Sequence, residues 1–568
     1  MNKDAHKIDG EVSIVLCGEA GQGIKTVESL LTRILKRAGY NVFATKEYMS
    51  RIRGGSNSTQ IRVSKRRVAS FVERIDILIP INRAPIDRLK YRITDSTVIL
   101  GEKDAYDEAL RVIDISFGRL ADEVGGDLYA NTIAAGAVVG LLAVEEEIVS
   151  ASVKQVFSGK GEDVIDKNLA AANKGCEVGA NLRTSGALVV EMEPASALSR
   201  ELLVSGAEAV GMGAIAGGCN FIFSYPMSPS TGVLTFLAKH HREFGIIVEQ
   251  AEDEIAAINA GLGAWYAGAR AMVTTSGGGF ALMIEGVSLA GMLETPMVIH
   301  VAQRPGPATG LPTRTAQEDL NLVLHAGHGE FPRIILSPGT LEDGFYLTQK
   351  AFNLADEFQV PVFILTDQFF MDSYYNIGAL DPSALQNEAH IVETGEDYRR
   401  FALTDNGISP RGIPGSGKGL VCVDSDEHDE AGHITEDLDL RTKMVNKRLK
   451  KLELITQAAI APEIIGGDSY EILVLAWGST RNVIAEALAD LAREDISLLH
   501  FSQVYPLHES VAETLERAST VVAVENNATG QFASLIELET GHEVDGKVLK
   551  YNGLPFSKEE IVEVLRGF

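Results

Sequence analysis

Cysteine is scarce in this chain: four thiols occur among 568 residues. Cys17, Cys176, Cys219 and Cys422 are far apart in sequence, and no CxxC pair occurs. This spacing argues against an iron–sulfur cluster or a zinc site held by this chain alone. A disulfide framework is not expected either, which indicates a reducing compartment, and we expect a cytoplasmic protein.

Basic residues are also few: 51 Lys and Arg stand against 78 Asp and Glu, for a formal net charge of -27. Binding to nucleic acid or to anionic membrane surfaces needs clustered Lys and Arg, so we expect neither partner. The uncharged run at 209–238 is long enough to cross a membrane, but Asn220, Pro226, Pro229 and several glycines break it. The first ten residues lack an apolar core and do not resemble a signal peptide.

The order of apolar runs and glycine turns is typical of a multi-domain α/β protein. We expect four segments: an α/β domain over 1–190, a doubly wound sheet over 196–375, a polar connection over 376–469 and a second α/β domain over 470–568. In the second segment, short strands alternate with helical intervals, which predicts a parallel sheet covered on both faces. Its expected strands lie at 220–223, 245–248, 271–274, 297–301 and 361–365.

Some motifs imitate known sites. Gly18–Thr26 resembles a P-loop, but Ile24 interrupts the spacing before the lysine. Gly412–Lys418 has the right spacing, but a glycine follows where a hydroxyl residue would bind magnesium, so nucleotide hydrolysis is not expected at either place. His428 and His433 lie among carboxylates and present possible metal ligands, although this composition is also typical of a solvated acidic loop.

The strongest sign of chemistry is a carboxylate where an apolar helix begins. A hydroxyl-rich loop, Tyr225–Thr231, is followed by an apolar strand and then by acidic residues that end at Glu254. Burial raises the pKa of an isolated glutamate, so that it can share a proton with a nitrogen base near neutral pH. Acidic residues are also common in the first turn of a helix, where they cap it, and both interpretations remain open.

Two further loops follow predicted strands. Gly277, Gly278 and Gly279 lie in a strand-to-helix turn, where glycine lets the backbone approach a ligand closely. Arg304 follows the next strand, at the edge where open α/β sheets bind ligands. An arginine there suits a small carboxylate through paired hydrogen bonds, although it can equally form a structural ion pair.

Taken in order, these motifs resemble the α subunit of 2-oxoacid:ferredoxin oxidoreductases with a γ domain fused at its N-terminus. The resemblance implies a thiamine-diphosphate-binding, pyrimidine-type doubly wound sheet, a γ-like α/β domain and a transketolase C-terminal-like α/β domain. The γ-like motifs lie at 18–23 and 53–62, and the α-like motifs at 225–231, 250–256, 275–280, 303–312, 327–332 and 525–531.

The resemblance also implies a reaction: coenzyme A-dependent oxidative decarboxylation of a 2-oxoacid, or its reductive reverse. Of the possible substrates, 2-oxoglutarate matches best, and pyruvate and branched-chain 2-oxoacids stay open. An aryl-pyruvate enzyme of the indolepyruvate type is an alternative, but that family usually carries cysteine-rich cluster motifs, which are absent here. A non-catalytic α/β scaffold of a redox complex is the other alternative.

The implied assembly is a dimer of αβ units. Thiamine diphosphate would be shared with a β subunit that also holds magnesium and a [4Fe-4S] cluster and receives ferredoxin. An acidic ferredoxin would be repelled by this acidic chain. The γ-like domain is expected to support assembly, and Arg51 and Arg53 are candidates for coenzyme A phosphates, although a surface loop is the simpler interpretation.

The resemblance assigns individual residues. Glu254 matches the glutamate that contacts N1′ of the aminopyrimidine ring, and Gly277–Gly279 then belong to the cofactor site. Arg304 matches the arginine that binds the substrate carboxylate. Ser228 stands where threonine is usual in the hydroxyl loop that begins at Tyr225, and its alternative role is to cap the next helix. No metal ligand is implied on this chain.

Overall fold

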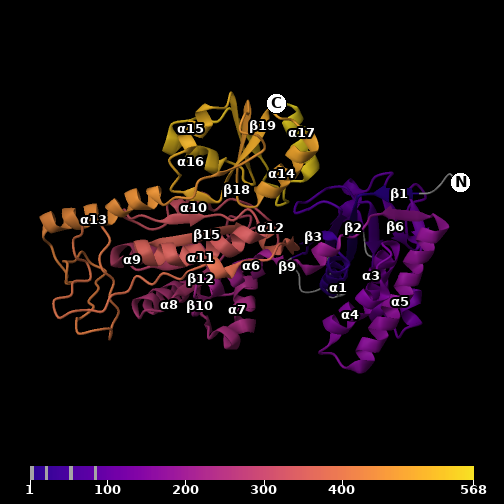
Figure 1. The fold of residues 1–568 in the computed structure, drawn as a ribbon, viewed down its shortest axis with the longest axis horizontal. Coiled ribbons are helices and arrows are strands. Elements are labelled where there is room, and N and C mark those ends of the chain that lie inside the picture. The colour runs from indigo at the N-terminus through magenta and orange to yellow at the C-terminus, as the bar shows by residue number, and fades with distance from the viewer. Residues whose placement is uncertain (1–5, 20–23, 50–55, 82–85) are drawn as a thin grey trace. The chain divides into compact units, whose positions relative to one another are not determined.

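The protein forms two compact units, shown by a computed structural model that describes residues 6–19, 24–49, 56–81 and 86–568 (Figure 1). Unit 1 consists of Met1–Val204, Asp372–Ala379 and Ser557–Glu559. Unit 2 consists of Ser205–Met371, Leu380–Phe556 and Glu560–Phe568. The finer division of the chain into four segments stays a prediction.

Unit 1 is built on a mixed sheet of eight strands, in the order β7-β6-β5-β2-β4-β3-β16-β9 (Figure 1). The central strand β2 pairs in parallel with β5 and antiparallel with β4. A separate parallel pair joins β1 to β8. The strands are β1 (His6–Asp9), β2 (Glu11–Glu19), β3 (Asn41–Glu47), β4 (Ser56–Ser64), β5 (Ile77–Pro80), β6 (Val98–Gly101), β7 (Val112–Asp114), β8 (Leu188–Glu191), β9 (Leu202–Ser205) and β16 (Tyr374–Ile377).

The helices of unit 1 pack around a contact between two backbones. Helix α3 is buried along its whole length and crosses α5 at glycines. A Cβ on Gly175 would lie 2.1 Å from the carbonyl oxygen of Ile133, so only glycine allows this approach. The apolar core of the unit surrounds this crossing. The helices are α1 (Ile24–Arg37), α2 (Phe117–Asp122), α3 (Ala130–Leu141), α4 (Glu146–Phe157) and α5 (Glu162–Ser185).

Unit 2 contains the parallel sheet that the sequence predicts. Its order is β11-β10-β12-β13-β15-β14-β20, and every pairing is parallel except that of β14 with β20. All five expected strands are present, and β14 and β20 extend the sheet. The strands are β10 (Phe221–Ser224), β11 (Ile247–Gln250), β12 (Ala271–Thr275), β13 (Met297–Gln303), β14 (Ile334–Leu336), β15 (Pro361–Asp367) and β20 (Gln503–Tyr505).

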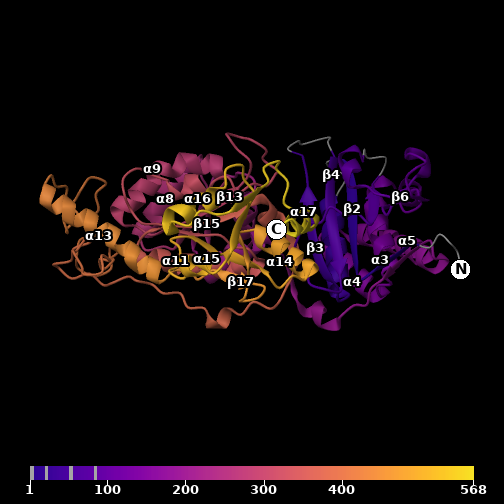
Figure 2. The same ribbon diagram turned by 90° about the horizontal axis from the view of Figure 1, so that it is seen from above.

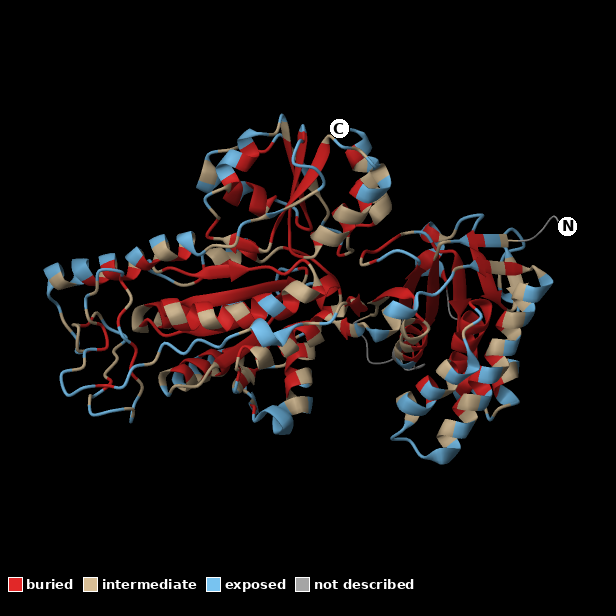
Figure 3. Cartoon of the chain, in the orientation of Figure 1, coloured by how far each residue is buried: buried red, intermediate tan, exposed pale blue. Residues whose placement is uncertain are grey.

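Helices cover both faces of this sheet. Helix α8 packs against α9, whereas α6 packs against α7 and α11. Figure 2 shows α8 and α9 on one side of the strands and α11 on the other, as right-handed crossovers in opposite directions along the sheet require. The strands β12, β13, β14 and β15 are buried between these layers, whereas the edge strand β11 is mostly exposed (Figure 3). The helices are α6 (Gly206–Ala216), α7 (Thr231–Phe244), α8 (Glu254–Tyr266), α9 (Gly277–Leu293), α10 (Leu320–Leu324), α11 (Leu341–Phe358) and α12 (Gln368–Asp372).

The C-terminal part of unit 2 forms a five-stranded sheet in the order β17-β19-β18-β21-β22. The pairing of β14 with β20 joins this part to the seven-stranded sheet. No helix in the described ranges combines the length and the apolar character that crossing a membrane requires. The elements are β17 (Glu463–Ile465), β18 (Ile472–Trp477), β19 (Ile496–Phe501), β21 (Thr520–Glu525), β22 (Gly546–Leu549), α14 (Thr480–Leu491), α15 (Val511–Glu516), α16 (Gln531–Thr540) and α17 (Lys558–Arg566).

The predicted polar connection ends in a helix with a charged buried side, α13 (Leu438–Gln457). Its Lys447 and Lys451 ammonium groups lie 2.6 and 2.5 Å from the carboxylate of Glu294, which follows the last residue of α9. Burial alone would raise the pKa of Glu294, but the two lysines hold it well below its usual range. Arg400, in the irregular part of the connection, donates to the Glu294 carbonyl oxygen at 2.6 Å. This buried cluster anchors the connection to the seven-stranded sheet.

Candidate active site

Glu254 is the first residue of α8, which begins beside the carboxyl edge of the parallel sheet. Its side chain is buried, with 3% of the residue surface exposed. The hydroxyl group of Thr275, the last residue of β12, lies 3.5 Å from Glu254 Oε1. The helix cap is Asp253, whose carboxylate accepts a hydrogen bond from the Ala256 N–H at 2.8 Å. The Glu254 carboxyl group therefore faces the protein interior, and the capping role belongs to its neighbour.

The surroundings of Glu254 favour its protonated form. Burial raises the pKa of this carboxyl group and the charge of Asp253 adds to the rise, whereas backbone and Thr275 hydrogen bonds oppose it. Ile255, the next residue of the helix, is 50% exposed. The side chains that close the interior face of the helix are instead Ala257 and Ile258, because the Ile255 position points away from the sheet.

The glycine turn at the start of α9 makes room for two carboxyl groups. A Cβ on Gly279 would lie 2.2 Å from Glu254 Oε1, and a Cβ on Gly277 would lie 2.2 Å from Asp319 Oδ2. At Gly278 the nearest atom would be 3.5 Å away, which is an ordinary contact. Two of the three predicted cofactor-site glycines are therefore required by close neighbours, and the middle one is exposed.

Arg304 and Ser228 come together as the sequence pattern suggests. Arg304 directly follows β13, and its Nη1 donates to the Ser228 carbonyl oxygen at 2.7 Å. Ser228 and Tyr225 are both exposed at this edge of the sheet. The alternative in which Ser228 caps the next helix is wrong, because Ser230 occupies the cap position and makes no side-chain cap bond.

Asp319 is a residue of this site that the sequence analysis missed. It lies in the loop between β13 and α10, and its Oδ2 is buried without a hydrogen-bond partner among the described residues. Burial and the charge of Glu318 raise the pKa of Asp319 to about 7, although Arg304 acts in the opposite direction. The loop sequence is polar and carries no sign of burial, so only the folded chain reveals this carboxyl group.

Comparison with known proteins assigns the chain to a family. A family of pyruvate flavodoxin/ferredoxin oxidoreductases, described as thiamine diphosphate-binding, matches residues 212–447, and the pyruvate ferredoxin/flavodoxin oxidoreductase family matches residues 13–178. The α subunit of 2-oxoacid:ferredoxin oxidoreductase from a Sulfolobus species is 32% identical, over 98% of this chain and 96% of its own length. The chain belongs to the α-subunit family of 2-oxoacid:ferredoxin oxidoreductases.

Other members of the family agree with this result. The 2-oxoglutarate synthase subunit KorA of Archaeoglobus fulgidus is 32% identical, over 64% of this chain and 98% of its own length. The solved 2-oxoglutarate:ferredoxin oxidoreductase from Magnetococcus marinus, with 2-oxoglutarate, coenzyme A and succinyl-CoA bound, is 30% identical and has a TM-score of 0.91, covering 98% of this chain and 99% of its own. The resemblance, the α/β fold class and the assignment as an oxidoreductase subunit are confirmed.

The residues at the carboxyl edge fit the thiamine ring expected in this family. An aminopyrimidine ring offers a nitrogen that can share a proton with a carboxyl group, and Glu254 is a buried carboxyl group whose pKa is raised. Ser276, at the start of the glycine turn, has a buried hydroxyl oxygen without a partner in the described residues. This chain thus presents a buried polar group that no described residue hydrogen-bonds, and the neighbouring glycines have no side chain that would block a ligand from the backbone.

The cysteines of this subunit do not suit a cluster. All four are free thiols. Burial raises the pKa of Cys17 and of Cys219 to about 12, and that of Cys176 to about 11, so these thiols stay protonated. Cluster ligation requires thiolates. That a partner subunit holds the cluster stays a prediction.

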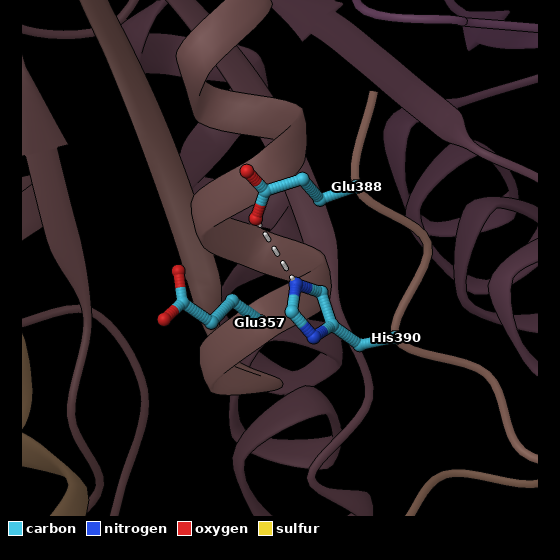
Figure 4. A group of neighbouring side chains, drawn as sticks. All are labelled: Glu357, Glu388 and His390. Carbon is cyan, nitrogen blue, oxygen red and sulfur yellow. Dashed lines mark ion pairs between the residues drawn. The ribbon is translucent and has the colours of Figure 1, made fainter. Parts of the chain in front are cut away.

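One group in the described ranges has the spacing of metal ligands: Glu357, Glu388 and His390 (Figure 4). Their ligand atoms lie within 4.8 Å of one another, and His390 Nε2 is 3.5 Å from Glu388 Oε2. Glu357 lies near the end of α11, which leads into the amino end of β15, so the group is at the sheet edge opposite the candidate site. An exposed ion pair accounts for this group, and neither His428 nor His433 belongs to one.

Of the two P-loop-like motifs, Gly412–Lys418 lies wholly within the described residues. Gly412–Lys418 forms turns and an isolated bridge and is followed by irregular backbone instead of a helix, so the phosphate-binding geometry is absent there. Part of Gly18–Thr26 lies outside the described residues, as do Arg51 and Arg53.

Proposed function

We propose that this chain is the γ-fused α subunit of a thiamine diphosphate-dependent enzyme that oxidises a 2-oxoacid with coenzyme A and ferredoxin, or runs the reductive reverse. In the oxidative direction the bond to the carboxylate carbon breaks and CO2 leaves. The acyl group forms a bond to the coenzyme A sulfur. Two electrons pass one at a time to two ferredoxins, and one proton is released.

The observation that carries this proposal is the buried Glu254 carboxyl group between Thr275 and Gly279. Thiamine diphosphate, when bound, supplies the carbanion chemistry. Glu254 would hold a proton at Oε1 and share it with a ring nitrogen, and burial favours that role because it raises the pKa of the carboxyl group. The Thr275 hydroxyl group orients Oε1, and Gly279 leaves space for it.

Substrate binding is proposed for Arg304 together with the loop of Tyr225 and Ser228. The hydrogen bond from Arg304 Nη1 to the Ser228 carbonyl oxygen fixes the guanidinium group and leaves its other donors for a carboxylate. Among 2-oxoacids we favour 2-oxoglutarate, because the Archaeoglobus relative is a 2-oxoglutarate synthase subunit and the Magnetococcus structure contains 2-oxoglutarate and succinyl-CoA. Ser228 keeps the hydroxyl group that threonine would provide but has no methyl group.

A β subunit is proposed to complete the site on the face formed by α8 and α9. Ile255 and Leu282 are 50% and 51% exposed on these adjacent helices, and Ile247 on the edge strand β11 is 51% exposed. Apolar exposure next to a buried catalytic carboxyl group is typical of a surface that a partner covers. The partner would hold the diphosphate, magnesium and a [4Fe-4S] cluster and receive ferredoxin, and the complete cytoplasmic enzyme would be a dimer of αβ units.

Replacing Glu254 by glutamine tests the proposal. The variant and its β subunit are reconstituted with thiamine diphosphate and coenzyme A, and 2-oxoglutarate-dependent reduction of a viologen dye is measured. Losing one proton-sharing group should lower kcat by on the order of 10²–10⁴. The matched control is Glu252→Gln, since Glu252 is exposed two residues away and should keep parental activity.

If Glu254→Gln retains most of the parental rate, the catalytic assignment is wrong. That outcome would return the non-catalytic scaffold to consideration, an alternative that full-length similarity to named enzyme subunits does not favour.

A further inference from the structure

Two buried polar atoms beside Gly277 lack partners among the described residues. One is the Ser276 hydroxyl oxygen and the other is Asp319 Oδ2. Asp319 Oδ2 lies so close to Gly277 that a Cβ at position 277 would displace this oxygen. Buried polar groups in native proteins nearly always have a hydrogen-bond partner, so two such atoms at one place indicate a ligand that binds there.

The backbone of Asp319 is held firmly, although no described residue forms a hydrogen bond with its Oδ2. Its N–H donates to Gln303 Oε1 at 3.0 Å. Two residues before Asp319, the Gln317 N–H donates to the Asn526 carbonyl oxygen at 2.7 Å, and the Asn526 N–H donates to Gln317 Oε1 at 2.9 Å. Gln531 Nε2 donates to the carbonyl oxygen of Glu318, the residue before Asp319, at 2.8 Å. The motif at 525–531, which has no other role in the site, thus fixes the backbone that carries Asp319.

Within the part of the chain that the structure describes, two charged side chains act on Asp319. Arg304, from the end of β13, is the opposite charge, and Glu318 is the like charge on the same loop. The start of α9 contributes only Ser276 and glycines, β13 contributes the neutral Gln303, and α16 contributes a neutral glutamine. Burial raises the pKa of Asp319 more than Arg304 lowers it. With a pKa of about 7, the carboxyl group is mainly protonated at lower pH and mainly ionised at higher pH.

The two protonation states have opposite effects on a bound carboxylate. Ionised Asp319 competes with a 2-oxoacid for Arg304 and repels the substrate's negative charge. Protonated Asp319 leaves Arg304 available and has an O–H group to donate. We propose, on the basis of the proposed function, that Asp319 is a positioning residue that must carry a proton when the 2-oxoacid binds. Substrate binding in alkaline solution therefore takes up one proton.

The pH dependence of the KM for 2-oxoglutarate tests this role in the complete αβ enzyme. For the parent, KM should rise about tenfold per pH unit above about pH 7, because the competent protonated fraction falls by that factor. Asp319→Asn keeps an uncharged donor of the same shape, so its KM should stay close to the parental low-pH value up to pH 9. Asp319→Ala should lose the pH dependence too, with KM raised at every pH and kcat changed less.

Calorimetry supplies a second measurement that does not depend on turnover. With thiamine diphosphate, coenzyme A and ferredoxin omitted, 2-oxoglutarate is titrated into the complex at pH 8 in two buffers with different protonation enthalpies. The parent should take up close to one proton and Asp319→Asn none. Glu252→Gln, an exposed carboxylate near the site, should behave as the parent does.

An Asp319→Asn enzyme whose KM rises with pH as steeply as the parental KM would overturn the inference, as would equal proton uptake by the two proteins. Even if Asp319→Ala does not fold, the asparagine variant keeps the comparison decisive. A parental complex that shows no 2-oxoacid-dependent dye reduction contradicts the proposed function itself, whereas an active complex with an unchanged asparagine profile contradicts only the role of Asp319.

Discussion

Replacing Gly279 by alanine should damage catalysis out of proportion to its effect on stability. The new Cβ would stand 2.2 Å from Glu254 Oε1 and 2.2 Å from Thr275 Oγ1. Real Cβ contacts stay above 3.0 Å, so each oxygen must retreat by at least 0.8 Å, the difference between the two distances. A misplacement of about 1 Å at a reacting group lowers rates by on the order of 10²-fold. We therefore expect kcat to fall by that factor.

The control for this experiment is Gly286→Ala, on the same helix. Its Cβ would stand 2.6 Å from Ile258 Cγ2, so the α8–α9 contact is crowded without touching a carboxyl group. Both variants should lose about 1–3 kcal/mol of unfolding free energy through overpacking, measured by urea denaturation. Only Gly279→Ala should lose dye reduction per folded complex. Parental kcat in Gly279→Ala, or an equal loss in Gly286→Ala, would refute the reasoning.

Other perturbations test separate parts of the structure. Arg304→Ala should raise the KM for 2-oxoglutarate by about 10- to 150-fold, since charge-assisted hydrogen bonds contribute about 1.5–3 kcal/mol; an unchanged KM rejects its carboxylate role. Lys451→Met leaves the buried Glu294 with one ammonium partner and should cost about 3–5 kcal/mol in urea unfolding, whereas a cost below 1 kcal/mol would show that the cluster is not structurally important. Gly175→Val must separate α3 from α5 and should lower the melting temperature in calorimetry, and an unaltered value would contradict the backbone contact. Glu254→Gln should raise the melting temperature at pH 8 but not at pH 4, because the raised pKa of Glu254 in the folded state costs stability only when the pH exceeds the unfolded-state pKa. Equal shifts in melting temperature at both pH values would argue against burial of the charge.

The central strands of unit 2, β12, β13 and β15, are predictable from sequence because their apolar runs are short, buried and separated by helical intervals. Helix α13 is different, although its buried positions follow helical spacing. Three of these positions are Lys447, Arg448 and Lys451, so a search for apolar periodicity does not find the helix. Their acidic partners, Glu294 and Glu427, lie on other segments, and only the folded chain pairs them.

Long-range pairing sets a second limit on prediction. β16 is four residues long and joins the sheet of unit 1, where Tyr375 lies opposite Phe43 of β3. The Val42 N–H donates to Asn376 Oδ1 at 2.8 Å beside this pairing. A strand this short has no hydrophobic alternation that specifies its register. Its partner is therefore not readable from local sequence, and we expected these residues to lie at the boundary of a different domain.

The candidate site combines both situations in two carboxyl groups that lie beside the glycines at the start of α9. Glu254 is visible in sequence, because an acidic residue enters an apolar helix. Asp319 lies in a polar loop, and its Oδ2 is buried only once the chain has folded. Burial raises the pKa of both. Glycine at 277 and 279 admits one carboxyl group on each side of the turn, while the exposed Gly278 between them contacts neither. Two acids held on either side of this turn can serve separate partners, Glu254 a cofactor ring and Asp319 a substrate carboxylate, and this separation is a physical reason for glycine at positions 277 and 279.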